Sequence, residues 1–345
     1  MPIIEEILQE AEKSGASDVH LTVGATPKMR VNGRLLNMPY SKMMPADTLD
    51  ILLAIMSETQ RERFERRGEC DFSFSVPGGG RFRVNAYRQK GSVALAFRIV
   101  GERIPSFGEL GIPASVGEVY RRRQGLVLAV GPSGCGKTTT LAAIVDKINE
   151  NREAHILTIE DSIEYLHPHR QSMINQREIG TDSESYADAL RAAFKEDPDV
   201  IMAGELRDGE TAELVITAAE TGHLMLSTLN ASGAVNAVKR LIQLFQPHCQ
   251  QQMRARLAGA LEAVIFQQLI PTSDGEGRVA AFEILIANRE VRRLIREGKE
   301  QQLSGIMQAN RKTGMITMNE ALVQLYQAGK IDKDTAVWYA QEPVN

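Results

Sequence analysis

The residues with the clearest chemical meaning lie in one segment, residues 131–138, with the sequence GPSGCGKT. It has the spacing G-x-x-x-x-G-K-[ST] of a phosphate-binding P-loop. Glycines at these positions allow backbone N–H groups to point inward at phosphate oxygens, and the start of a following helix adds partial positive charge. Lys137 is expected to reach the β- and γ-phosphates, and the Thr138 hydroxyl to hold Mg²⁺. The predicted nucleotide contacts are Gly131, Ser133, Gly134, Cys135, Gly136, Lys137, Thr138 and Thr139.

Hydrolysis also requires an acidic side chain at the end of a neighbouring strand, where it can organise Mg²⁺ and a water molecule. Glu205 fits this requirement because it closes the apolar run 199–205 directly after Gly204. A carboxylate at the carboxyl end of such a strand lies beside the P-loop in parallel α/β proteins. Helix capping, or an ion pair near Arg207, is the alternative role for Glu205.

A second acidic cluster, residues 158–164, follows another apolar run and contains Glu160, Asp161 and Glu164. Three carboxylates this close together need a cation or an arginine partner if they are buried. They could line a site for Mg²⁺ and a triphosphate, or form a solvated acidic loop. His223 follows a glycine and begins a further apolar run; it is either structural or a sensor of the γ-phosphate.

These residues sit on alternating strand and helix patterns, which indicate a parallel sheet flanked by helices. The P-loop lies between an apolar strand and a helix with Leu141, Ile144, Val145 and Ile148 at helical spacing. In such a sheet, ligands bind at the carboxyl ends of the strands. The expected strands are 125–130, 156–159, 200–203 and 224–228, and the expected helices are 139–149, 186–195 and 211–219.

The flanking regions have other patterns. Residues 1–100 indicate a small α+β domain with two amphipathic helices, 3–11 and 45–56, and antiparallel strands joined at Asn32-Gly33 and at Gly78-Gly79-Gly80. Residues 101–123 are rich in Gly and Pro and are interpreted as a linker. The pattern after Asn230 is mainly helical, at 235–245, 250–269 and 290–297, with one hairpin around residues 274–277.

Composition narrows the class of protein. The 345 residues are 43% hydrophobic and 24% charged, which is typical of a globular chain with two or three domains. The net charge of -4 gives no overall basic field that would attract nucleic acid. Three scattered cysteines favour a reducing compartment. No apolar run approaches the roughly 18 residues of a membrane span, and the acidic N-terminus is unlike a secretory signal, so we expect a cytoplasmic protein.

Several segments together resemble the PilT-like retraction (twitching-motility) ATPases of type IV pili, within the type II/type IV secretion ATPases. The resemblance covers nearly the whole chain. Glu205 with its strand is similar to the family's atypical Walker B segment, residues 158–167 to its Asp box, and residues 222–230 to its His box. Residues 15–21 resemble the start of the family's N-terminal domain, and residues 288–297 a C-terminal motif tied to retraction.

The resemblance implies an α/β fold with a small PAS-like N-terminal domain (1–100), a linker (101–123), a RecA-like P-loop core (124–270) and a mostly helical C-terminal region (271–345). It also implies ATP and Mg²⁺ as cofactors, and a homohexamer that works on an inner-membrane pilus platform protein, docked at the inner face of the cytoplasmic membrane. By position, Thr138 and Glu205 would bind Mg²⁺, Glu164 would polarise the water, and His223 would sense phosphate. Arg83 and Arg98 are the candidates for nucleotide-facing arginines of the N-terminal domain.

The chain departs from the family pattern at two positions, with Asn230 where a second histidine is usual and Ser162 where proline is usual. An amide can hydrogen-bond a phosphate or a water but cannot take up a proton near neutral pH. The expected activity is ATP hydrolysis that powers pilus retraction. The alternatives are an accessory retraction ATPase that acts with a second pilus ATPase, a related secretion ATPase, a nucleic-acid motor, or a scaffold that binds ATP without hydrolysing it.

Overall fold

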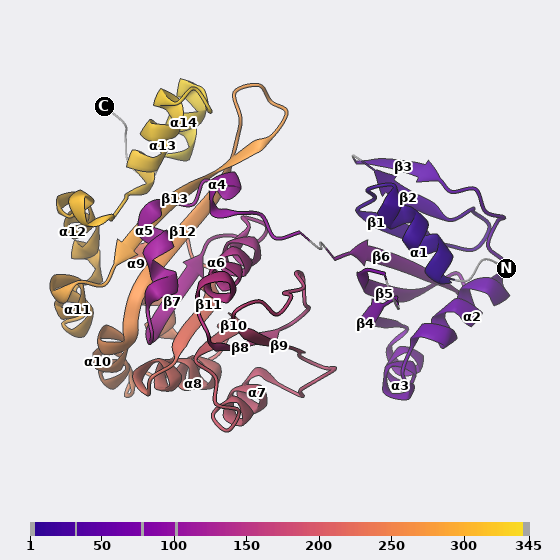
Figure 1. Cartoon of the computed structure of the whole chain (residues 1–345), viewed down its shortest axis with the longest axis horizontal. Helices are drawn as coiled ribbons and strands as arrows, with labels where there is room; N and C mark the ends of the chain where they lie inside the picture. Colours follow the sequence, from indigo (N-terminus) through magenta and orange to yellow (C-terminus); the bar gives the residue numbers. More distant parts are fainter. Residues whose placement is uncertain (1–3, 32, 77–78, 101–102, 341–345) are drawn as a thin grey trace. The chain divides into compact units, whose positions relative to one another are not determined.

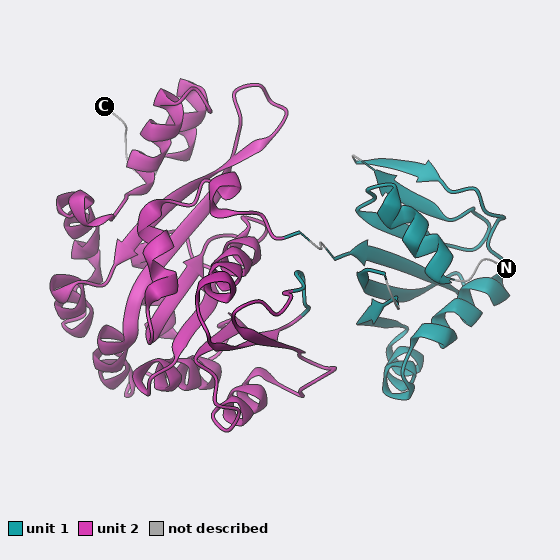
Figure 2. Cartoon of the chain, viewed as in Figure 1, with its two compact units in different colours: residues 1–103, 162–166 teal, residues 104–161, 167–345 magenta. Residues whose placement is uncertain are grey.

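The computed structural model describes residues 4–31, 33–76, 79–100 and 103–340. The chain forms two compact units (Figure 2): residues 1–103 with 162–166, and residues 104–161 with 167–345. Two expected turn residues, Asn32 and Gly78, lie outside the described residues. Within the described ranges, no helix combines the length and apolar character that crossing a membrane requires.

The first unit is built on a six-stranded antiparallel sheet with the strand order β3-β2-β1-β6-β5-β4 (Figure 1). The meander predicted from alternating residues is confirmed, because β4, β5 and β6 pair antiparallel in sequence order. The sequence pattern did not indicate that β1 joins this meander beside β6. The strands are β1 (Asp18–Leu21), β2 (Lys28–Val31), β3 (Arg34–Asn37), β4 (Glu69–Ser75), β5 (Arg81–Gln89) and β6 (Ser92–Ile99).

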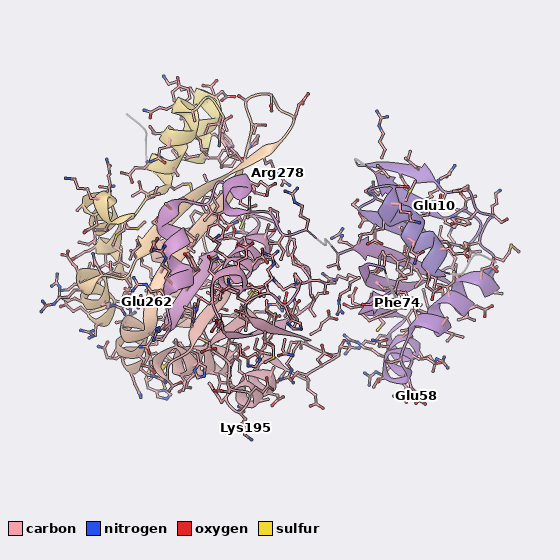
Figure 3. The ribbon with its side chains drawn as sticks, in the orientation of Figure 1. Glu10, Glu58, Phe74, Lys195, Glu262 and Arg278 are labelled. Atoms are coloured by element: carbon pink, nitrogen blue, oxygen red, sulfur yellow. The ribbon has the colours of Figure 1, made fainter. Side chains whose placement is uncertain are left out.

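One face of this sheet carries the core of the first unit. Phe82, Val84 and Ala86 alternate along β5 and are fully buried against Leu95 and Phe97 of β6 and against the helices. Phe74 of β4 is partly buried against the same cluster, whereas Glu58 begins α3 on an exposed surface (Figure 3). The helices are α1 (Ile4–Lys13), α2 (Pro45–Ile55) and α3 (Glu58–Arg67).

The second unit contains a seven-stranded sheet with the order β13-β12-β7-β11-β10-β8-β9. Its neighbouring strands pair in parallel except for β12 and β13, which form an antiparallel hairpin. The predicted parallel strands are therefore present. The strands are β7 (Gly125–Val130), β8 (His155–Glu160), β9 (Met173–Glu178), β10 (Val200–Glu205), β11 (Leu224–Leu229), β12 (Leu261–Pro271) and β13 (Arg278–Ile286).

Helices cover both faces of this sheet, which explains why its strands are continuous apolar runs. All six residues of β7 are buried; Leu126 and Leu128 point into one hydrophobic cluster, and Val127 and Ala129 into the other. The first cluster contains side chains of α7 (Tyr186–Ala193), α8 (Gly209–Glu220), α9 (Ala234–Gln243) and α10 (Gln250–Ala260). The second contains those of α6 (Lys137–Asn151), α5 (Ala114–Gly117) and η1 (Glu118–Arg121).

The remaining elements complete the second unit around the same sheet. Ile104, Phe107 and Leu110, in and before α4, pack against the second cluster. Side chains at exposed helix ends, such as Lys195 after α7, project outward (Figure 3). These elements are α4 (Phe107–Leu110), α11 (Arg289–Arg296), η2 (Glu300–Gln302), α12 (Leu303–Ala309), η3 (Arg311–Thr313), α13 (Met318–Gln327) and α14 (Lys333–Tyr339).

The helix predicted over residues 250–269 is wrong in its second half. The chain leaves α10 after Ala260 and continues as β12, which pairs in parallel with β7 and antiparallel with β13. A short continuous apolar run fits a buried helix or a buried strand equally well, and here sheet pairing decides between them. The elements that were not predicted include α3, which buries only Phe64, and the polar edge strand β9. They also include the short helices α4, α5 and η1, which lie within the segment interpreted as a linker.

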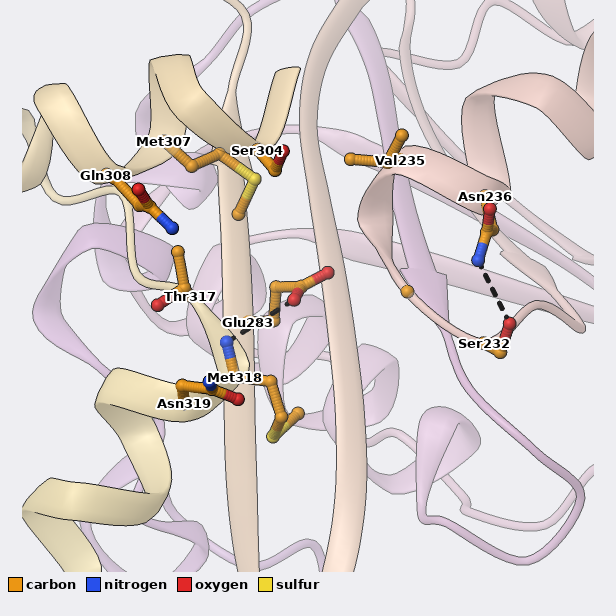
Figure 4. Close-up of a pocket in the computed structure, with 11 residues that line it drawn as sticks. Ser232, Val235, Asn236, Glu283, Ser304, Met307, Gln308, Thr317, Met318 and Asn319 are labelled. Atoms are coloured by element: carbon orange, nitrogen blue, oxygen red, sulfur yellow. Dashed lines mark hydrogen bonds between the residues drawn. The ribbon is translucent and has the colours of Figure 1, made fainter. Parts of the chain in front are cut away.

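A buried carboxylate joins two helices to the hairpin strand β13. Glu283 accepts hydrogen bonds from the backbone N–H of Ala234 (2.6 Å) at the start of α9 and from that of Met318 (3.3 Å) at the start of α13. It lines a cavity of about 90 Å³ with residues of α12 and of the loop before α9 (Figure 4). Burial raises the pKa of Glu283, and the two N–H donors favour its charged form. This carboxylate anchors the loop that runs from Asn230 into α9.

Candidate nucleotide-binding and hydrolysis site

The P-loop has the backbone geometry that its glycines predict. It leaves β7 after Val130 and enters α6 at Lys137. Gly131, Gly134 and Gly136 have φ angles of +151°, +76° and +90°, which L side chains rarely adopt. A Cβ atom on Gly131 would lie 2.5 Å from the Cys135 sulfur. The loop therefore depends on glycine for its conformation and for its close packing.

A glutamine from outside the predicted site holds this loop in place. Gln267 of β12 is 2% exposed, and its side-chain nitrogen donates to the Cys135 carbonyl (2.6 Å). A Cβ atom on Gly136 would lie 3.1 Å from the same nitrogen. Cys135 is itself buried, and burial raises the pKa of its thiol, so it supports the loop as a neutral packed side chain. Sequence reasoning missed Gln267, although a glutamine within an apolar run is a usable signal of a buried polar contact.

The ammonium group of Lys137 is fully hydrogen-bonded. It donates to the carbonyls of Gly131 (2.8 Å) and Pro132 (2.9 Å) and to the side-chain oxygen of Asn230 (2.8 Å). An ammonium has three donors, so these three acceptors use all of them. Lys137 thus bonds back to its own loop and also to the segment that follows β11.

Asn230 continues this contact to the predicted hydrolytic carboxylate. Its side-chain nitrogen donates to one oxygen of Glu205. Arg207 donates to the other oxygen (3.1 Å) and also to Asp161 (2.9 Å). The result is a row of alternating charge, with Lys137 and Arg207 as the cations and Glu205 and Asp161 as the anions. Glu205 is 22% exposed, so solvent still reaches it.

Sheet order explains why these distant residues meet. Strands β7, β11, β10 and β8 are adjacent and parallel, so their carboxyl ends share one edge. The P-loop follows β7, Asn230 follows β11, Glu205 ends β10, and Asp161 follows β8. The prediction that a ligand site forms at this edge follows the general rule for parallel sheets.

The residue before Glu205 is glycine because a side chain of α7 occupies the space beside it. A Cβ atom on Gly204 would lie 2.1 Å from the hydroxyl of Tyr186. The register between β10 and β11 shifts at this point, and Ser227 donates to the Gly204 carbonyl (2.8 Å). Burial and the nearby Asp161 carboxylate raise the pKa of Tyr186, which stays protonated. Together these contacts fix the direction in which the Glu205 side chain leaves the strand.

Glu160, the last residue of β8, is buried in a polar cluster. It accepts from the Thr158 hydroxyl (2.7 Å) and from the side-chain nitrogen of Gln176 (3.3 Å). Gln176 in turn accepts from the backbone N–H of His167 (2.9 Å). The second acidic cluster is therefore divided, since Glu160 faces the interior whereas Asp161 faces the Arg207 side chain.

His167 provides a test of how burial at this edge affects stability. Burial, assisted by Arg170, lowers the pKa of His167 from 6.5 to about 4. The unfolded chain therefore binds a proton at His167 at higher pH than the folded chain does. The free energy of unfolding is highest, as far as His167 is concerned, above pH 6.5, and it falls as the pH drops toward 4. His167→Gln should remove up to about 3 kcal/mol of this acid sensitivity. Urea midpoints measured from pH 7.5 to 4.5 check it; parallel curves for both proteins would contradict the prediction.

The structure does not bring His223 to the P-loop of its own chain. His223 immediately precedes β11, whereas Asn230 immediately follows it. The six residues of β11 separate them by roughly 20 Å. The Nδ1 atom of His223 lies 3.1 Å from the Ala218 carbonyl near the end of α8, and its ring packs edge-on to Phe194. These contacts are those of a structural histidine, and they do not place His223 near the phosphate-binding loop of the same chain.

The other predicted residues belong to the first unit. Glu164 is exposed in the segment Ser162–Leu166, which groups with that unit. Arg83 and Arg98 are direct partners on β5 and β6, so their side chains leave the same face of the sheet, opposite to the core. Arg98 donates to Asp18 (3.0 Å) yet remains 72% exposed.

The donor set of the second unit fits a nucleotide and its magnesium ion. The loop provides backbone N–H groups, and its glycines have positive φ angles. It also provides the Lys137 ammonium and the Thr138 hydroxyl, both in the first turn of the fifteen-residue helix α6. Among the described residues, no group of three or more His, Cys, Asp or Glu side chains is arranged to hold a metal.

The fold and the P-loop edge identify the class of this protein. The profile of the family described as "Type II/IV secretion system protein" matches residues 1–332. The chain therefore belongs to the type II/IV secretion system protein family. Its α/β architecture, with an N-terminal antiparallel sheet and a mixed, mostly parallel second sheet, is that of a solved pilus retraction motor, PilT with bound ADP. That structure matches with a TM-score of 0.91 and 45% identity, over 99% of this chain and 98% of that one.

Within the family, the chain groups with the pilus retraction, or twitching-motility, ATPases. It is 43% identical to a twitching motility protein of Neisseria gonorrhoeae over 92% of this chain and 84% of that protein. It is 42% identical to the type IV pilus retraction ATPase PilT of Pseudomonas aeruginosa over 99% of both chains. The resemblance stated from the sequence motifs is confirmed.

Proposed function

We propose that this chain is a Mg²⁺-dependent ATPase in which the P-loop binds ATP and the carboxyl edge of the second sheet hydrolyses it. The main observation behind this proposal is that Lys137 and Glu205 both hydrogen-bond the side chain of Asn230. A phosphate-binding cation and a hydrolytic carboxylate must lie close together for hydrolysis, and sheet order places them on neighbouring loops. The solved PilT motor, which is 45% identical, has bound ADP, and this supports nucleotide binding by this chain.

Each residue of the site has a proposed role. The backbone N–H groups of residues 131–136 and the Lys137 ammonium would bind the phosphates, and Thr138 and Glu205 would hold Mg²⁺. Magnesium, when bound, neutralises charge on the β- and γ-phosphate oxygens. Glu205 orients the attacking water, and Arg207 keeps the Glu205 carboxylate in place. Glu164 is proposed, by its position in the family's Asp box, to polarise that water.

We further propose that the first unit is a PAS-like domain and that the second contains the RecA-like core. Arg83 and Arg98 leave the exposed face of the first unit's sheet side by side, which is the arrangement expected of two arginines that serve a phosphate. An arginine that stabilises charge in the transition state contributes about 10³- to 10⁵-fold in rate. Closure of each nucleotide site would then drive rigid-body movement of the two domains.

The work performed is proposed to be retraction of a type IV pilus. The identity to retraction ATPases over nearly the full chain supports this assignment. We propose a homohexameric ring in the cytoplasm that docks at the inner face of the membrane on a pilus platform protein. Nucleic acid is not a proposed partner, because the net charge of -4 gives no basic field.

Three measurements test this function: ATP hydrolysis, sedimentation, and the surface pili of a strain that lacks the protein. Purified protein should hydrolyse ATP in the presence of Mg²⁺, lose the activity in EDTA, and sediment as a hexamer. A strain that lacks the protein should carry more or longer surface pili, because retraction is lost while extension continues. Purified protein that hydrolyses ATP only after a second pilus ATPase is added would instead indicate an accessory motor. A strain with fewer pili would contradict a retraction role.

A further inference from the structure

The side chain of Asn230 contacts both charged groups of the site with its two ends. Its oxygen accepts from the Lys137 ammonium (2.8 Å), and its nitrogen donates to Glu205. A carboxamide carries one acceptor and one donor group on a single rigid plane, so both contacts are made in one orientation. This residue is part of neither the P-loop nor the strand that ends at Glu205.

The contact with Lys137 competes with phosphate. All three donors of the ammonium are used, by two loop carbonyls and by Asn230. Lys137 must therefore exchange at least one acceptor before it can bind a phosphate oxygen. The loop carbonyls of Gly131 and Pro132 stay beside the ammonium because they belong to the loop itself. The amide of Asn230 is the acceptor that comes from a separate element.

The contact with Glu205 restricts the orientation of its carboxylate. One oxygen accepts from Asn230 and the other from Arg207 (3.1 Å). With a donor on each oxygen, the carboxylate is held against rotation about its last bond. A base or metal ligand that must meet a water in one geometry loses rate when its orientation is free. The Asn230 loop is anchored in turn, because the helix it enters is capped by Glu283 at Ala234.

We propose that Asn230 is a positioning residue with two opposed effects: it restrains Lys137 and so weakens nucleotide binding, and it orients Glu205 and so accelerates hydrolysis. This inference rests on the proposed ATPase function. Asn230 lowers the affinity for nucleotide and raises kcat. Because an amide does not titrate near neutral pH, both effects are independent of pH in that range. A residue that merely supports the fold would change affinity and turnover in the same direction.

Calorimetric titration with ADP measures the first effect without any turnover. Asn230→Ala removes the competing acceptor, so we expect ADP to bind several-fold and up to about tenfold more tightly than to the wild type. Asn230→Asp keeps the shape but places a carboxylate against the ammonium, and charged acceptors form the stronger hydrogen bonds. We therefore expect Asn230→Asp to bind ADP at least about tenfold more weakly, which is about 1.4 kcal/mol.

Steady-state hydrolysis measures the second effect. Asn230→Ala frees one oxygen of Glu205, and Asn230→Asp places a like charge beside it, so kcat should fall about 10- to 100-fold in both variants. Asn230→His should restore kcat to within a few-fold at pH 8, because a neutral imidazole has one donor and one acceptor nitrogen. Asn236→Ala is the matched control, since Asn236 is exposed on α9 and bonds only the Ser232 hydroxyl (3.1 Å) in the described structure.

The affinities of the two variants decide the proposal. It is overturned if Asn230→Ala binds ADP no more tightly than the wild type, or if Asn230→Asp binds ADP as tightly as the wild type. Asn230→Asp preserves the volume of the side chain, so it remains a test if Asn230→Ala does not fold. Failure of the ATPase function itself is distinguishable, because the wild-type protein would then show no ADP binding and no Mg²⁺-dependent hydrolysis.

Discussion

Replacing Lys137 with alanine is expected to reduce ADP and ATP affinity by about 100-fold and ATP hydrolysis to background. The ammonium is the one side-chain cation in the P-loop, and it lies within 3 Å of the Gly131 and Pro132 carbonyls. Charge-assisted hydrogen bonds contribute about 1.5–3 kcal/mol each, and 1.4 kcal/mol corresponds to a tenfold change in affinity. Loss of the ammonium also removes its stabilisation of charge on the transferred phosphate.

Lys147 provides the control for this variant. It lies on the same helix, α6, and is 40% exposed in a surface ion pair with Glu150 (3.4 Å). Such pairs contribute little to stability, so Lys147→Ala should leave ADP affinity and kcat unchanged. ADP titration and steady-state ATPase assays on both variants make the comparison. If Lys137→Ala hydrolyses ATP at the wild-type rate, this loop is not the catalytic site.

Replacing Glu205 with glutamine is expected to lower kcat about 10²- to 10⁴-fold while ADP affinity stays within a few-fold of the wild type. Glutamine keeps the length of the side chain and an oxygen that can accept from Asn230, but it has no negative charge to bind Mg²⁺ or to accept a proton. It also loses the ion pair with Arg207 (3.1 Å). Glu205 is 22% exposed and Arg207 is 60% exposed, so that loss should cost little stability.

Glu210 gives a matched substitution outside the site. It lies in the first turn of α8, is 62% exposed and pairs with Arg191 on the surface. Glu210→Gln should therefore behave as the wild type in both assays. A Glu205→Gln protein that hydrolyses ATP at the wild-type rate would show that another carboxylate organises the water. Equal losses of affinity and kcat would instead show damage to the whole site.

The two variants are informative together because they separate binding from chemistry. Lys137 lies in the loop that is proposed to bind phosphate, and Glu205 lies two strands away on the same edge. We expect Lys137→Ala to fail in both assays and Glu205→Gln to fail in hydrolysis alone. A protein that binds ATP only as a structural ligand would show the first loss and no effect of the second substitution.

Most of the second unit could be predicted from local patterns. The P-loop is recognisable because its glycines are required by local backbone geometry, seen in the positive φ angles of Gly131, Gly134 and Gly136. The parallel strands were recognisable because both of their faces are buried, which leaves continuous apolar runs such as β7 and β11. Glu205 was predicted as the hydrolytic carboxylate because it is the acidic residue that ends such a run. These features depend on neighbours in the sequence.

Other features depend on contacts between distant parts of the chain. Residues 261–269 have an apolar run that suits a helix or a strand, and pairing with β7 and β13 decides that they form β12. The position of Gln267 against the Cys135 carbonyl follows from that pairing. The importance of Asn230 follows from strand order, which places β11 between β7 and β10. His223 lies at the other end of β11 from Asn230, about one strand length away.

The amino-acid sequence by itself determined the P-loop motif, the alternating strands and helices of a parallel sheet, and a carboxylate at the end of a strand, because each of these appears as a pattern of residues that are close together in the chain. Only the tertiary structure decided which side chains meet at the sheet edge. Lys137 and Asn230 are 93 positions apart in the chain. Their contact results from the order in which strands pair, and that order is set by packing of the whole sheet against its helices.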